Sequence, residues 1–188
     1  MTNNLIPYIA FVALCYAHIS CNSTKTLHQD YIKHTKGFMK FIRSTQFPND
    51  TILLADKPDM REFNRCINSV FYDTTLFTKA EQEIIKTQIN KPLLKKWNER
   101  LVAKLKIISR DTLDVIFKDR NKSWQYFYKH FGRRFHSFCA PIFLRNNTLC
   151  IFYSEYGCGS LCAAGQIQFY NKEGDDWKLI KSFCDWVS

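Results

Sequence analysis

The sequence predicts an α+β domain in which N-terminal helices pack on a C-terminal antiparallel β-meander of about four strands. Apolar residues recur at helical spacing through much of the first 131 residues. From Phe138 onward they form short runs rich in Ile, Phe, Tyr and Trp. Helices followed by strands are typical of this fold class. The length of 188 residues fits one domain, and no internal repeat divides it.

The first 20 residues contain no Lys, Arg, Asp or Glu, and Leu5 to Ala17 form an apolar run. Such a run is typical of a signal peptide and is shorter than the ~20 apolar residues of a transmembrane helix. We therefore expect residues 1–20 to be a signal peptide. Residues 21–188 would form a single domain with a short N-terminal tether. A buried first helix of a cytosolic domain is the alternative.

Ser20-Cys21, which follows this apolar run, resembles the lipobox of bacterial lipoproteins. In that motif the signal is cut before a cysteine whose thiol carries the lipid. The resemblance implies that Cys21 is the lipidation site and that a lipid anchor holds the chain at a bacterial membrane. Simple secretion, with cleavage near Ser20, is the competing interpretation.

The expected helices come first along the chain. Residues 24–44 carry apolar side chains at helical spacing: Leu27, Tyr31, Phe38, Phe41 and Ile42. A short strand is expected at residues 51–55. Thr78 and Glu81 have the spacing of a capping box, so a helix should begin at Lys79 and run to about Ile89.

Two further helices are expected before the sheet. Lys91-Pro92 should begin one with an apolar stripe made of Leu94, Trp97, Leu101 and Leu105. The other covers residues 122–131 and leads into Gly132. The strands then follow at residues 141–144, 148–154, 166–170 and 177–183. Asn146-Asn147 and residues 172–175 have the composition of turns between them.

Cysteine usage favours disulfides. Of eight cysteines, Cys15 lies in the expected signal and Cys21 carries the expected lipid, which leaves six, an even number that suits an exported domain. Spacing favours only Cys158 with Cys162, because Gly159 lets the intervening segment turn. Buried free thiols are the alternative for this pair. The pairing of the other four stays open: Cys66, Cys139, Cys150 and Cys184.

The net charge of +10 predicts a surface that attracts anions. For an exported protein this favours an acidic protein or an anionic envelope polymer over nucleic acid. Trp124, Phe127, Phe131, Phe135 and Phe138 recur at steps of three and four, which indicates a buried helical face that continues past Gly132. The cations among them are candidates for binding an anion: Lys129, Arg133 and Arg134.

No residues stand out as catalytic, and we expect no cofactor and no metal site. Ser160 lacks the G-x-S-x-G elbow, because Cys158 and Cys162 occupy the glycine positions. His130 and His136 have no carboxylate obviously paired with them. A hydrolase with a dispersed site stays possible, because catalytic triads assemble from residues far apart in sequence.

Several C-terminal segments together resemble a loose group of uncharacterised lipoproteins from Bacteroidetes-type bacteria. They are residues 139–147, the aromatic strand at 150–153, the Cys-Gly-Ser-Leu-Cys turn at 158–162, and residues 177–188. The resemblance implies an envelope location and no particular activity. The expected function is an envelope-tethered lipoprotein that binds a partner or an anionic envelope component without catalysis. A periplasmic immunity or inhibitor protein is the alternative.

Overall fold

The computed structural model describes residues 6–71, 75–119 and 122–188, and side chains from Lys25 onward. Five helices and seven strands lie in these residues. In chain order they are α1 (Ile6–Gln46), β1 (Ile52–Ala55), α2 (Met60–Phe71), α3 (Lys79–Asn90), β2 (Leu105–Ile108), α4 (Arg110–Lys118), α5 (Ser123–His130), β3 (Phe135–Phe138), β4 (Ile142–Leu144), β5 (Leu149–Gly159), β6 (Cys162–Glu173) and β7 (Asp176–Val187).

The strands form one mixed sheet in the order β2-β1-β3-β5-β6-β7, with β4 paired to β5. The four predicted strands are present as the antiparallel meander β4 to β7. The prediction of a simple meander is nevertheless wrong, because β1 also runs parallel to β2 and β3. Parallel neighbours need long connections, and α2 to α5 lie in those connections.

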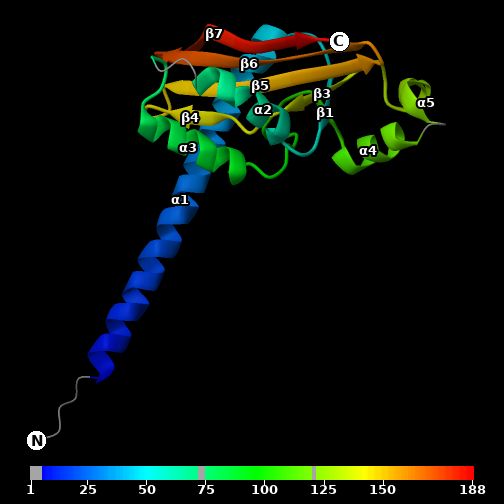
Figure 1. The fold of residues 1–188 in the computed structure, drawn as a ribbon. Helices are drawn as coiled ribbons and strands as arrows, with labels where there is room; N and C mark the ends of the chain where they lie inside the picture. Colours follow the sequence, from blue (N-terminus) through cyan, green and yellow to red (C-terminus); the bar gives the residue numbers. More distant parts are fainter. Residues whose placement is uncertain (1–5, 72–74, 120–121) are drawn as a thin grey trace, which may run out of the picture.

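Helices cover both faces of this sheet (Figure 1). The domain end of α1 passes behind the strands, and α2 and α3 lie in front of them. Phe38 of α1 is fully buried, and its ring meets Phe143, Phe152, Tyr170 and Trp177 edge-on at centroid distances of 5.2–6.2 Å. Such contacts add to the burial of apolar area. The main core therefore lies between α1 and the meander.

A smaller core lies under α4 and α5. Ile108, Leu113, Ile116 and Phe127 are buried together there, beside β1. Phe135 packs on this cluster from β3, and Phe138 belongs to the main core. The prediction of one helical face that continues past Gly132 is therefore wrong, because the chain passes from α5 to β3 between Phe127 and Phe135.

The helix expected after Lys91 does not form. Its apolar residues are buried as expected, yet residues 91–104 have no regular structure. The Trp97 backbone N–H donates to the Asp56 oxygen at 2.8 Å, and the Trp97 indole donates to the Phe138 oxygen at 3.4 Å. Tertiary hydrogen bonds thus replace the bonds that a helix would make.

The predicted start of α3 is confirmed, whereas α1 begins earlier than the helix predicted from the sequence. Thr78 and Glu81 form the predicted capping box at the start of α3. The backbone of α1 contains the helix predicted at 24–44 and also runs through residues 21–23, where a tether is predicted. No helix in the described part of the chain has the length and apolar content needed to cross a membrane.

Candidate functional site

A pocket of about 500 Å³ lies beyond the domain end of α1. It forms because β3, β5, β6 and β7 continue past Gln46, where α1 ends, so this part of the sheet face is left without a helix. Phe47 closes one side, with its ring 5.0 Å from that of His136. A pocket of this size is in the usual range of small-ligand sites.

Arg134 supplies the positive charge of the pocket. Its guanidinium lies 5.4 Å from the centre of the Tyr156 ring, in a cation–π contact. No carboxylate of a described residue forms an ion pair with Arg134. The tyrosine ring therefore orients the guanidinium, and the edge donors stay available for an anionic group.

His136 is a neutral group in the pocket wall. Its backbone pairs with Tyr156 across β3 and β5, and the side chain is buried. Burial, and then the charge of Arg134, lower the pKa of His136 from 6.5 to about 4. Neither ring nitrogen hydrogen-bonds to a described residue. A neutral imidazole can give one donor and one acceptor to a ligand.

Hydroxyl and amide groups line the floor. Ser154 and Gln166 face each other across β5 and β6 and both border the pocket. Gln46 is held in place by Tyr170, whose hydroxyl lies 2.8 Å from the Gln46 Nε2, and by Gln168 at 3.3 Å. These groups donate and accept hydrogen bonds without adding charge.

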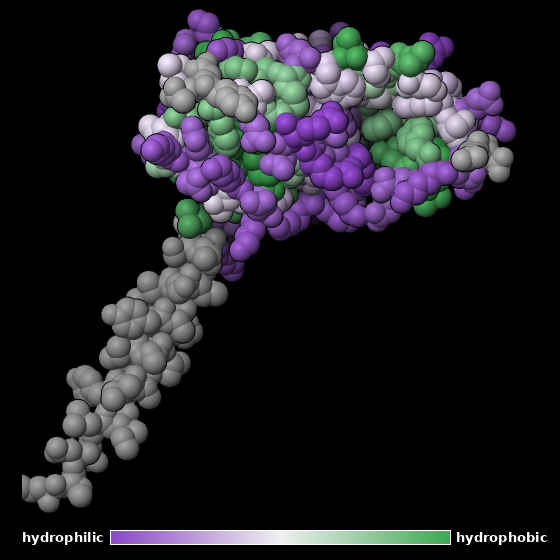
Figure 2. All heavy atoms as spheres, viewed as in Figure 1, coloured by the Kyte–Doolittle hydropathy of each residue, from purple (hydrophilic) through white to green (hydrophobic). Residues whose placement is uncertain are grey.

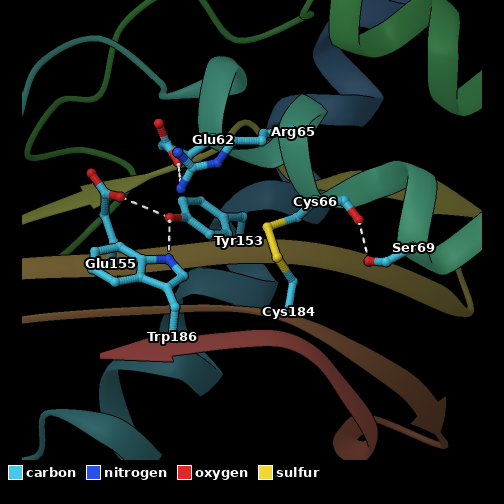
Figure 3. The surroundings of a disulfide bond; sticks show 8 residues. All are labelled: Glu62, Arg65, Cys66, Ser69, Tyr153, Glu155, Cys184 and Trp186. Carbon is cyan, nitrogen blue, oxygen red and sulfur yellow. Dashed lines mark hydrogen bonds and ion pairs between the residues drawn. A yellow bond between two sulfur atoms is a disulfide. The ribbon is translucent and has the colours of Figure 1, made fainter. Parts of the chain in front are cut away.

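A hydrogen-bonded chain adjoins the pocket, and two of its members, Glu155 and Trp186, belong to the lining (Figure 3). Trp186 donates from Nε1 to the Tyr153 hydroxyl at 3.2 Å, and that hydroxyl donates to Glu155 at 2.7 Å. Burial raises the pKa of the Glu155 carboxyl, and the hydrogen bond from Tyr153 opposes this rise. Gly165 leaves room for the chain, since a Cβ there would lie 2.7 Å from both Trp186 and Tyr153.

Two disulfides join cysteines whose side chains the structure describes. Cys158 pairs with Cys162, as the spacing favours, and Cys66 of α2 pairs with Cys184 of β7 beside Tyr153 (Figure 3). The other two cysteines in the domain are buried free thiols, Cys139 and Cys150. Burial raises the pKa of Cys139 to about 12, so the thiolate needed for reaction is scarce.

The pocket brings together residue types that hydrolases use. His136, Ser154 and Asp185 all border it, but no hydrogen bond joins His136 to either of the others. Activation of a nucleophile needs such a bond to a base, and a base with a pKa of about 4 is weak at neutral pH. The arrangement is suited to holding a polar ligand.

Of the three residues predicted to bind an anion, one lies in the pocket lining. Arg134 lines the pocket, whereas Lys129 on α5 and Arg133 are exposed outside its lining. The His130 ring lies 4.3 Å from the Tyr126 ring, at an interplanar angle of 36°. The predicted lipidation site, Cys21, falls within α1, but its side chain lies outside those that the structure describes. The described residues hold no group of three metal-ligating side chains.

Comparison of the chain with protein-family models, with curated proteins and with solved structures finds no match. Sequence reasoning missed Tyr156 and Trp186 as pocket residues, because they lie on different strands and carry no local motif. The interleaving of aromatic residues and cations before Phe138 was the one available signal, and it led to Arg134.

Proposed function

We propose that this chain is a lipoprotein of a bacterial envelope, anchored through Cys21, whose domain binds an acidic glycan in the pocket around Arg134. The observation that carries the proposal is an arginine without a carboxylate partner, held on the Tyr156 ring beside a neutral His136. Uncharged donors and acceptors lie around it, and the carboxyl groups of Glu155 and Asp185 also belong to the lining.

This combination suits an acidic sugar better than a simple anion. Arginine binds a carboxylate or phosphate through two parallel hydrogen bonds. Gln46, Gln166 and Ser154 offer partners for ring hydroxyls, and Phe47 offers an apolar surface. Asp185 also borders the pocket, so a dense cluster of negative charge would be repelled there. An acidic glycan, which spaces its charges between neutral hydroxyls, fits both conditions.

Binding can be tested with a matched pair of arginine variants. Oligosaccharides that contain uronic acid, and neutral ones of equal length, are titrated into the purified full chain by calorimetry. Arg134→Ala should weaken binding of the acidic oligosaccharide at least ten-fold, whereas Arg133→Ala should change it less than two-fold. Equal losses in both variants would indicate diffuse charge. If no acidic sugar binds, or if acidic peptides bind in its place, the proposal is wrong.

The anchor is tested separately. Cys21→Ser should release the protein from the membrane fraction and abolish incorporation of labelled fatty acid, because the variant lacks the thiol that carries the lipid. If wild type incorporates no fatty acid, and the variant still sediments with membranes, the lipidation proposal is wrong. The glycan pocket does not depend on this result.

One observation favours a second candidate function, that of a periplasmic inhibitor protein. The disulfide between Cys158 and Cys162 closes the turn of residues 158–162, here called the tip, and Leu161 on it is 87% exposed. A rigid loop that presents one apolar side chain is suited to enter a pocket of another protein. Leu161→Ser should then abolish capture of a protein partner and leave glycan binding unchanged.

A further inference from the structure

A second groove lies where α1 leaves the domain. Two adjoining hollows of about 400 and 420 Å³ share residues of α1 and of the segment that follows α3. We call this the basal groove and define it by six residues: Leu27, His28, Ile32, Leu93, Lys95 and Arg100. It lies at the opposite end of the domain part of α1 from Gln46 and the Arg134 pocket.

The basal groove has apolar side chains bordered by cations, and the one acidic residue in its described lining, Asp30, lies 3.3 Å from the His34 imidazole. Leu27 is 68% exposed and Leu93 is 42% exposed, although both are large and apolar. Residues 91–104 contain five cations and a single carboxylate, that of Glu99. Lys96 pairs with Asp56 at 3.2 Å, but no described carboxylate pairs with Lys91, Lys95 or Arg100. Figure 2 shows hydrophilic residues along this edge of the domain.

We infer that the basal groove docks on the anionic lipid headgroups of the membrane that anchors the chain. This rests on the proposed lipidation of Cys21. Cys21 precedes His28 by seven residues in α1, which corresponds to a rise of about 10 Å. The groove would therefore lie about one Debye length, ~8 Å in physiological salt, from the surface that holds the lipid.

The chemistry of the groove matches that surface. Exposed apolar side chains bordered by Lys and Arg are typical of elements that lie in the membrane interface. Each cation close to an anionic membrane strengthens association about five-fold, and Lys91, Lys95 and Arg100 have no competing ion pair with a described residue. Lipid headgroups thus provide the counter-charge that no described carboxylate gives to these three cations.

Docking would also fix the distance between the Arg134 pocket and the membrane surface. Gln46 follows His28 by 18 residues in α1, or about 27 Å along the helix axis. A domain docked by its basal groove would hold the Arg134 pocket away from the lipid, where an envelope glycan can reach it. A domain that rotates freely about its anchor would not hold the pocket at a fixed distance from the membrane.

The experiment measures lysine accessibility in the full chain. Lipidated protein is reconstituted in vesicles of phosphatidylcholine, with or without 30% phosphatidylglycerol, and treated with an acetylating reagent. Acetylation of Lys91 and Lys95, read by mass spectrometry, should be at least three-fold slower on the anionic vesicles, and 0.5 M salt should remove the difference. Lys178 on β7, at the far edge of the sheet, should react equally on both.

Matched variants assign the effect to the groove. Lys95→Glu with Arg100→Glu should abolish the protection of Lys91, whereas Lys178→Glu should leave it intact. Equal acetylation on both vesicle types would overturn the inference, even where Cys21 carries its lipid. If Cys21 proves unlipidated, the unmodified chain is mixed with the same vesicles. Protection of Lys95 then supports the groove alone, and its absence overturns the inference.

Discussion

The disulfide between Cys66 and Cys184 joins α2 to the edge strand β7 across 118 residues of sequence, whereas the tip disulfide spans four. The first, here called the clamp, lies beside the partly buried Tyr153–Glu155 hydrogen bond; the second closes an exposed turn. The clamp fixes how a helix sits on the sheet. The tip fixes only the shape of a turn. Similar chemistry thus serves the fold at one place and a surface at the other.

The largest effect is expected at the clamp. Cys66→Ala with Cys184→Ala should lower the free energy of unfolding by about 4–5 kcal/mol, because the cross-link closes a loop of more than one hundred residues in the unfolded chain. Guanidinium unfolding under oxidising conditions measures this. A loss equal to or smaller than that of the tip variant would contradict the comparison.

Gly165 tests whether the hydrogen-bonded chain beside the clamp is tightly packed. A Cβ at this position would lie 2.7 Å from the Trp186 Nε1 and the Tyr153 hydroxyl, so both must move and their hydrogen bonds must lengthen. Gly165→Ala should cost about 2–3 kcal/mol of stability. Thermal and denaturant unfolding measure this loss.

Gly37 in α1 supplies the control. Apart from its chain neighbours and the backbone of its own helix, no atom would lie within 4 Å of a Cβ there, and α1 is helical around it. Gly37→Ala should therefore stabilise the protein by up to about 1 kcal/mol, through helix propensity. Similar losses in both glycine variants would show that the region around Gly165 is not specially packed.

The sequence predicts the features that depend on contacts between neighbouring residues. It does not predict those that depend on contacts between residues far apart in the chain. The tip disulfide depends on a five-residue segment with a glycine, and the capping box of α3 depends on Thr78 and Glu81. Both could be predicted. The clamp could not, because its cysteines meet only after α2 docks beside β7, where Cys184 adopts a left-handed backbone with φ of 53°.

The sheet shows the same contrast. Strands β4 to β7 follow one another and pair with their sequence neighbours, so their patterns were sufficient. Strands β1, β2 and β3 are short and pair across long connections, so β2 and β3 were missed. The amphipathic spacing of Phe63, Cys66, Ile67 and Val70 could have indicated α2. In the pocket, Arg134 was predicted, but its neighbours come from other strands.

Acid should destabilise the folded protein through His136 of β3. Its pKa is lowered in the folded chain to about 4 from 6.5, so the unfolded chain binds the proton more tightly. The neutral residue therefore contributes stability above pH 6.5, and this contribution is lost as the pH falls toward 4. Between pH 7.5 and pH 5 the loss is about 2 kcal/mol.

The measurement compares unfolding at the two pH values in wild type and in His136→Asn. Wild type should lose about 2 kcal/mol more than the variant. The raised pKa of Glu155 works in the opposite direction, but it is present in both proteins and cancels in the difference. Equal losses in the two proteins would show that His136 titrates normally.

The smallest effect is expected at the tip. Cys158→Ala with Cys162→Ala should cost only about 1–2 kcal/mol, because a five-residue loop loses little entropy on closing and β5 already pairs with β6 beside it. The Tyr128 hydroxyl, which donates to the Cys158 oxygen at 2.7 Å, holds the turn against α5 in either case.

If the tip presents Leu161 to a protein, the variant without the tip disulfide should lose partner capture while its free energy of unfolding changes little. The clamp variant should do the reverse at temperatures where it stays folded, since α2 lies away from the tip. Loss of capture in both variants would mean that the two disulfides do not serve separate purposes.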